Sequence, residues 1–177
     1  MTMKIKRLTL ALCLLTLGFN AARANENEVR SAVWDVFNNL KAGNYSQLYD
    51  SLPDNVQKKV TREKFTNALS RSRDNYEVDR MDLGKVRVKG DLAVVDTVLY
   101  GRLKKPFQGD GKIVAQQYLV RQNGRWRVAT GDTATINQFL KANPGFAKQF
   151  PVRQPQVLFK NDRGEWIDVR SLMKKRK

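Results

Sequence analysis

The sequence offers carboxylates and tyrosines for acid–base chemistry. The chain of 177 residues contains no histidine, which excludes a histidine general base and the Ser-His-Asp and Cys-His arrangements. Its single cysteine, Cys13, lies in an apolar run near the N-terminus. The remaining route is a carboxylate buried beside a tyrosine, because burial raises the pKa of a carboxyl group toward neutrality. The candidates are Asp35, Asp96, Tyr49, Tyr100 and Tyr118.

Asp96 is the strongest of these candidates, because it lies inside the apolar strand predicted over residues 92–99. If it faces the interior, it has the environment of a general base, with Tyr100 or Tyr118 as the acid. The alternative is that Asp96 faces solvent or pairs with an arginine across the sheet. Alternation cannot separate the two, since both faces of this strand are apolar. Catalysis is therefore the second interpretation, and a non-catalytic role is the first.

Motifs for metals and cofactors are missing from the sequence. Without histidine, and with its one cysteine near the N-terminus, the chain offers no zinc ligand set. It has no acidic calcium-binding loop and no glycine-rich phosphate loop before a helix. The sequence therefore predicts neither a metal ion nor a cofactor.

The chain is strongly basic, with 33 Lys and Arg against 17 Asp and Glu and a formal net charge of +16. Such an excess favours anionic partners such as phospholipid headgroups or cell-wall polymers. The alternative is a solvated basic surface that keeps the protein soluble. The candidate anion-binding residues are Arg121, Arg125 and Arg127 around one predicted turn, and the C-terminal Lys174, Lys175, Arg176 and Lys177.

The first 24 residues have the three-part pattern of a secretory signal. Three basic residues precede the apolar run over residues 8–19, and Ala22-Arg23-Ala24 places small residues where a signal peptidase reads. We expect cleavage after Ala24 and a secreted or periplasmic protein. The alternatives are an uncleaved anchor helix or a buried core helix, and a lipoprotein with Cys13 as its lipid-bearing first residue. Removal of Lys4, Lys6, Arg7 and Arg23 would leave a net charge of +12. Export argues against nucleic acid as the normal partner.

The residues after the signal predict helices first and strands second. Apolar residues at helical spacing predict a helix over residues 28–42, closed by Gly43. Shorter helices are predicted over residues 45–52, 56–60 and 61–72. Alternation then predicts an antiparallel meander over residues 76–89, 92–103, 113–121 and 125–130, with a bulge at Gly84.

The C-terminal part, residues 133–177, is predicted as an extension of the domain formed by residues 25–132. Its pattern indicates a helix to about Asn143, a helical turn over residues 146–150 and a hairpin that pairs residues 157–159 with 166–169. A basic tail from Met173 follows.

Two segments resemble the nuclear transport factor 2-like superfamily, the cone-shaped α+β fold of ketosteroid isomerase-like and SnoaL-like domains. Residues 32–45, AVWDVFNNLKAGNY, are similar to its opening helix, its Ala-Gly-Asn turn and its second helix. Residues 117–128, QYLVRQNGRWRV, are similar to its closing hairpin. The resemblance implies N-terminal helices packed on a strongly curved antiparallel sheet (a cystatin-like cone). It also implies a pocket at the wide end of the cone, and it leaves open a homodimer through the outer sheet face.

Three functions follow from these observations. The first is an exported, non-catalytic domain that binds a small molecule or a protein partner in or near the cone. The second is a hydratase- or isomerase-like enzyme that uses Asp96 and a tyrosine. The third is a basic protein that binds an anionic membrane or cell-wall surface.

Overall fold

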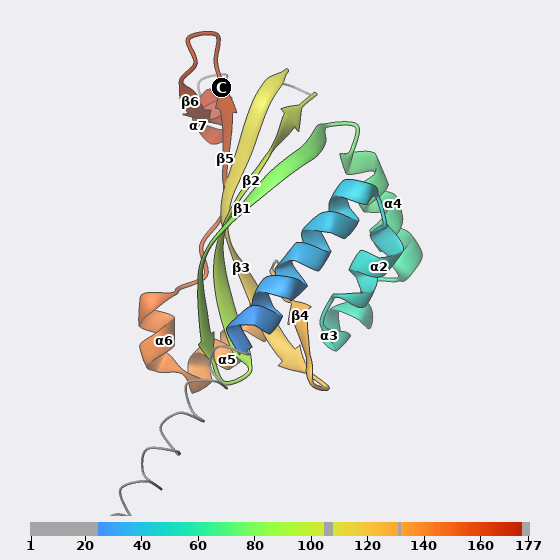
Figure 1. Cartoon of the computed structure of the whole chain (residues 1–177), viewed down its shortest axis with the longest axis vertical. Helices are drawn as coiled ribbons and strands as arrows, with labels where there is room; N and C mark the ends of the chain where they lie inside the picture. The colour runs from blue at the N-terminus through green and yellow to red at the C-terminus, as the bar shows by residue number, and fades with distance from the viewer. Residues whose placement is uncertain (1–24, 105–107, 131, 175–177) are drawn as a thin grey trace, which may run out of the picture.

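The computed structural model describes residues 25–104, 108–130 and 132–174, which form an α+β fold. Helices come first in the chain and pack against a curled, unclosed antiparallel sheet (Figure 1). The predicted fold class is confirmed. The predicted cleavage site at Ala24 and the candidates Lys175, Arg176 and Lys177 lie outside the described residues, as does the side chain of Lys174.

The N-terminal helices form because each has an apolar stripe and a turn that ends it. The first helix covers residues 25–42 and buries Val29, Val33 and Phe37 against the sheet. It ends at Gly43, whose φ of 77° is the left-handed conformation that glycine adopts most easily. The helices that follow are α2 (Tyr45–Asp50), α3 (Asp54–Gln57) and α4 (Arg62–Ser72).

The predicted meander is present with long strands. The four strands are β1 (Tyr76–Lys89), β2 (Leu92–Leu103), β3 (Gly109–Gln122) and β4 (Arg125–Val128). The β1–β2 turn contains Gly90, and the β3–β4 turn contains Asn123 and Gly124, all with positive φ. The β1–β2 register shifts between Leu83 and Val86, which confirms the bulge predicted at Gly84.

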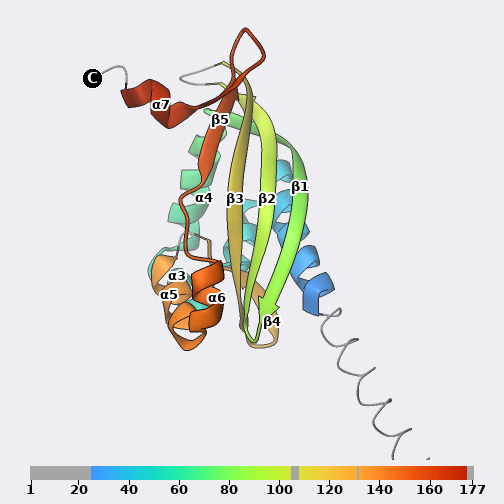
Figure 2. The same ribbon diagram turned by 90° about the vertical axis from the view of Figure 1, so that its left-hand side faces the viewer.

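The two faces of the sheet are buried by different layers. On the concave face the first helix packs over a core that includes Met81, Val95, Leu119 and Trp126. On the outer face a second core joins Leu92, Val94, Tyr118 and Val120 to helices from the C-terminal part. Figure 2 shows that these helices cover only one end of the outer face. The other end is open.

The C-terminal part is built into the domain. Its elements are α5 (Thr133–Ala142), α6 (Pro144–Gln149), β5 (Gln156–Lys160), β6 (Trp166–Asp168) and α7 (Val169–Lys174). Strand β5 pairs with β3 beyond the point where β4 ends, so the sheet order is β1-β2-β3-β5-β6 with β4 on the same edge of β3 as β5. The predicted hairpin is β5–β6, but Val169, expected in its second strand, begins α7.

Candidate functional site

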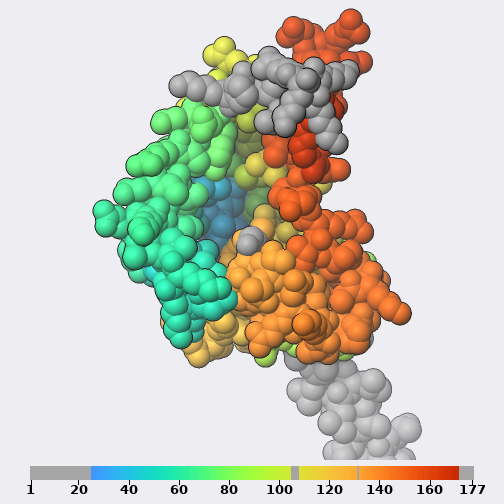
Figure 3. Space-filling view, turned by 180° about the vertical axis from the view of Figure 1, so that it is seen from behind, coloured from blue at the N-terminus to red at the C-terminus, as the bar shows by residue number. Residues whose placement is uncertain are grey.

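The concave face of the sheet holds an apolar groove at the end that the first helix does not cover. Its volume is about 250 Å³. Strand alternation places the side chains of Val78, Leu99, Leu103, Ile113 and Val157 on this face. All five are half-buried. Figure 3 shows the concave side as a hollow between α4 and the C-terminal strand β5, with the first helix deep inside it.

Two glycines shape the floor of this groove. A Cβ at Gly101 would collide with the carbonyl oxygen of Glu77 on β1, so this close strand approach requires glycine. A Cβ at Gly111 would lie 2.8 Å from Cγ of Leu103. The β1–β2 register also shifts between Val78 and Arg80. Glycines and a bulge therefore bend this end of the sheet and keep its concave face free of large side chains.

A smaller cavity lies further along the same face, between the first helix and the sheet. It has a volume of about 60 Å³ and is lined by Val36, Phe37 and Leu40 of the first helix and by Leu99 of β2, among others. Leu99 also lines the groove, so this one side chain borders both spaces. Thr97 and Gln117 give the small cavity a polar part as well.

Asp96 lies on the outer face, away from this groove. Its carboxylate accepts a hydrogen bond from Nη1 of Arg87 at 2.8 Å and another from Nε2 of Gln116 at 3.2 Å. Arg87 lies on β1, so the structure has the ion pair across the sheet that was the alternative to a buried base. A carboxylate held in this way, with a side chain that is 41% exposed, does not form the isolated acid of the catalytic interpretation.

Tyr100 and Tyr118 also lie on the outer face, but in different surroundings. Tyr118 is 2% exposed, and its hydroxyl donates to the carbonyl oxygen of Phe150 at 2.8 Å. Burial raises the pKa of the Tyr118 phenol. The ring of Tyr100 lies 4.2 Å from the guanidinium carbon of Arg80. Asp96 and Tyr100 are four residues apart on one strand, about 13 Å, which is too far for a shared proton.

The other two candidates are further from the groove. Asp35 is exposed on the first helix. Tyr49 is buried between α2 and α4, with its hydroxyl within hydrogen-bond distance of the carbonyl oxygens of Gln57 and Val60. Neither is brought together with Asp96.

The predicted basic cluster around the β3–β4 turn is largely occupied by contacts within the protein. Arg121 donates to Asn25 and Glu28 of the first helix. Arg127 donates to the carbonyl oxygen of Asp50. Arg125 is exposed at the turn. The structure therefore does not bring these three guanidinium groups together on one ligand.

No group of three or more Asp, Glu, His or Cys in the described parts of the chain is arranged to hold a metal ion. None of the described helices is both long enough and apolar enough to cross a bilayer. The fold defines a class, an α+β domain with a curled sheet that is hollow on its concave side. Neither protein-family models nor curated proteins gave a match to the chain.

Sequence reasoning predicted a hollow but did not name the residues that line it. The signal was Gly101 inside the strand predicted over residues 92–103, because glycine in a strand interior marks a bend or a close approach. Gly111 was predicted in a loop before the strand over residues 113–121, but β3 begins at Gly109 and includes it. Together with alternation from Leu99, Gly101 would have indicated the lining side chains of β2.

Proposed function

We propose that this protein is an exported, non-catalytic binding domain of the nuclear transport factor 2-like type, whose concave groove takes a small apolar molecule. The observation that carries this is the groove itself, where aliphatic side chains from four strands face an open space of about 250 Å³. Exposed apolar surface of this kind favours a partner that removes it from water.

The shape of the site supports an elongated ligand. The groove is near the lower limit of small-molecule pockets, which are roughly 300–1,000 Å³. A second cavity of about 60 Å³ lies on the other side of Leu99, toward the first helix. An alkyl chain fits the groove and would reach this cavity where Leu99 moves aside. A peptide would place amide groups in surroundings that offer few hydrogen-bond partners, at a cost of roughly 1–3 kcal/mol for each unpaired group.

A non-catalytic role is supported by where the ionisable candidates lie. Asp96, Tyr100 and Tyr118 are on the outer face, on the far side of the sheet from the groove. On the concave face the groove is lined mainly by aliphatic side chains, which transfer no protons. The phenol of Tyr76 also lines this face, where its oxygen lies 3.4 Å from Oγ of Ser72, and none of the carboxylate candidates faces it.

The test is a fluorescence titration with the neutral apolar probe N-phenyl-1-naphthylamine, which the net positive charge does not attract. Leu99→Asn puts an amide into the groove, and Val98→Asn, one residue away on the outer face, is the matched control. We expect Leu99→Asn to weaken probe binding by about tenfold, from the roughly 1–3 kcal/mol cost of burying an unpaired amide, and Val98→Asn to leave it unchanged.

Thermal melts of both variants show whether the fold is kept, and Ile113→Asn serves as a second groove variant. Equal loss in the groove variants and in Val98→Asn, or no probe binding by the wild type, would contradict the proposal. Export has its own test: the mass of the protein purified from the envelope fraction should match a chain that begins at Asn25.

A further inference from the structure

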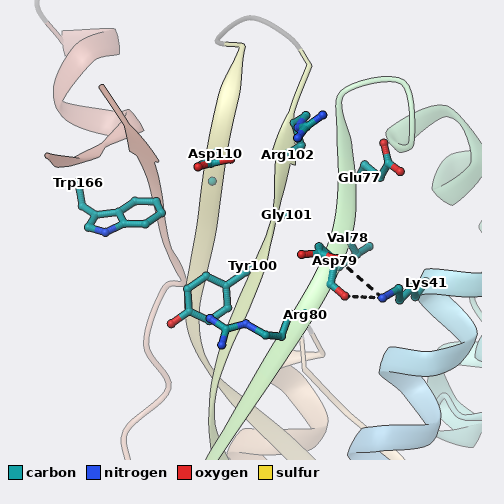
Figure 4. Close-up of a pocket in the computed structure, with 11 residues that line it drawn as sticks. Lys41, Glu77, Val78, Asp79, Arg80, Tyr100, Gly101, Arg102, Asp110 and Trp166 are labelled. Atoms are coloured by element: carbon teal, nitrogen blue, oxygen red, sulfur yellow. Dashed lines mark hydrogen bonds and ion pairs between the residues drawn. The ribbon is translucent and has the colours of Figure 1, made fainter. Parts of the chain in front are cut away.

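We propose that the outer face of the sheet carries a second binding site, an open trough suited to a neutral, hydroxyl-rich oligosaccharide. The trough has a volume of about 630 Å³ and crosses the strands at the end that α5 and α6 leave uncovered. Figure 4 shows Trp166 of β6 on one side of it and β1 with Glu77 on the other, and the Arg80 side chain reaches from β1 to the Tyr100 ring between them.

Lys41, in the last turn of the first helix, also lines the trough, and the trough shares six lining residues with the concave groove. The two proposals are told apart by side chains that face one side of the sheet, Trp166 and Tyr100 here and Leu99 and Ile113 in the groove.

The charge of the trough differs from that of the protein. The chain as a whole has a formal net charge of +16. The trough, by contrast, is lined by three basic residues (Lys41, Arg80 and Arg102) and three acidic ones (Glu77, Asp79 and Asp110). At the rim, Lys104 lies 3.5 Å from the carboxylate of Glu77 and Lys112 lies over Trp166, so two further positive charges border this balanced lining. A balanced lining attracts a polyanion, such as nucleic acid or an acidic polymer, less than an unpaired basic patch does. It suits a ligand without net charge.

The charged groups are also arranged in alternation. Arg102 on β2 is the direct register partner of Glu77 on β1 and of Asp110 on β3. Carboxylates only accept hydrogen bonds and guanidinium groups only donate them. A hydroxyl group does both, so a row of acid, base and acid can bind successive hydroxyls of one ligand.

Two aromatic rings complete the site. Trp166 is 38% exposed, and Nζ of Lys112 lies 4.2 Å from the centroid of its ring. Tyr100 is oriented in the same way by Arg80. Cations over ring faces stabilise these orientations. Arg80 and Lys112 each occupy one face of these rings, so a pyranose must pack its C–H face on the opposite face or displace the cation. Its hydroxyls then remain free at the ring edge for the neighbouring hydrogen-bonding groups.

The distance between the rims sets the size of the ligand. From β1 to β6 the sheet order crosses four interstrand spacings, about 19 Å at roughly 4.8 Å each. A single sugar cannot reach both sides. A linear oligosaccharide laid across the strands can touch Trp166, Tyr100 and the Glu77–Arg102–Asp110 row together.

The test is isothermal titration calorimetry of the purified protein with chitohexaose, cellohexaose and maltohexaose. The titrations are made in about 1 M NaCl, where the Debye length is about 3 Å and long-range charge attraction is screened. We expect at least one hexasaccharide to bind at millimolar concentration or below. Trp166→Ala and Tyr100→Ala should each weaken that binding by about tenfold.

Trp34→Ala is the matched control, because Trp34 is 39% exposed but does not line the trough and lies about two helical turns before Lys41, the residue of the first helix that does. The Trp34→Ala variant should bind the hexasaccharide as tightly as the wild type does. The proposal is overturned if none of the three sugars binds, or if Trp34→Ala weakens binding as much as Trp166→Ala. It is also overturned if Trp166→Ala and Tyr100→Ala weaken the binding of an anionic polymer at low salt but bind the hexasaccharides as the wild type does.

Discussion

Oδ2 of Asp96 lies 2.8 Å from Nη1 of Arg87, on the face of the sheet opposite the apolar groove. Arg87 also places its guanidinium carbon 4.4 Å from the centroid of the Phe150 ring. One arginine thus joins β1, the carboxylate of β2 and the end of α6. Asp96, the strongest catalytic candidate in the sequence, therefore belongs to the contacts that hold the C-terminal helices on the sheet.

Asp96→Asn should therefore change stability and not ligand binding. The substitution keeps the shape of the side chain but removes its charge, and the pair is partly exposed, with side chains 21% and 41% accessible. We expect the free energy of unfolding to fall by about 1 kcal/mol in urea denaturation. N-phenyl-1-naphthylamine binding should be unaffected. If the variant lost binding but kept its stability, Asp96 would be part of the ligand-binding site.

Tyr118→Phe should destabilise the contact between the sheet and the C-terminal helices. The variant leaves the carbonyl oxygen of Phe150 buried without its donor, which costs about 1–2 kcal/mol. Tyr100→Phe, on the same sheet face but without a buried hydroxyl contact, is the control and should be neutral. Equal destabilisation by both would show that the hydrogen bond to Phe150 is not the cause.

The same tyrosine gives a pH dependence. Burial raises the folded-state pKa of Tyr118 above 10.0, so folding favours the neutral phenol. This contribution to stability is present below pH 10 and is lost as the pH rises through the folded pKa. In a spectrophotometric titration the wild type should show a tyrosine that ionises late, and Tyr118→Phe should lack it. An unchanged titration curve in the variant would contradict the buried position of this phenol.

Asn55→Ala should weaken the contact between the N-terminal helices and the C-terminal part of the chain. Nδ2 of Asn55 on α3 donates to Oδ2 of Asp132 at 2.7 Å and contacts Oγ1 of Thr135 at the start of α5. We expect a loss of about 1–2 kcal/mol at neutral pH. Asn38→Ala, at an exposed position of the first helix, is the control and should cost nothing.

The effect of Asn55→Ala should shrink in acid. Burial acts to raise the pKa of Asp132, but the hydrogen bonds from Thr135 and Asn55, with the charge of Lys59, outweigh it and leave the pKa below 3.8. The stabilisation is therefore complete above about pH 4 and is lost as the pH falls through the lowered pKa. Urea denaturation at neutral and at acid pH measures both values. A difference between wild type and variant that persists unchanged in acid would show that Asp132 is not involved.

The sequence predicted those parts of the fold and of the candidate site that depend on contacts between residues close together in the chain. The bounds of β1 and β2 agree with the prediction because Gly90 fixes the turn between them. The direction of Asp96 was left open because both faces of β2 are buried, one by the first helix and the other by α5 and α6. Alternation carries no information where two different layers cover the two faces.

The place of the C-terminal part depended on long-range pairing. The hairpin of β5 and β6 was predicted from its own residues, but its pairing with β3 at Val114 and Gln156 joins segments that no local pattern connects. The groove has the same origin. It exists because the first helix covers only part of a sheet that Gly101 allows to bend, and neither fact is visible in periodicity.

Gly101→Ala tests that bend. The added Cβ meets the backbone of Glu77, which cannot move without shifting β1, so we expect a loss of about 2–4 kcal/mol in urea denaturation. Gly145→Ala is the matched control, because a Cβ there meets nothing within 4 Å and the residue is helical. It should stabilise the protein by up to about 1 kcal/mol. A neutral Gly101→Ala would mean that the strands do not approach as closely as described.

The most direct test of the binding proposal is an NMR measurement of contacts between decanol and the methyl groups of the protein. If the concave groove is the ligand site, nuclear Overhauser effects from the alkyl chain should reach Leu99, Ile113 and Val157. Contacts that reach only Val98, Val114 and Leu158, the neighbouring residues on the outer face, or no contacts at all, would contradict it.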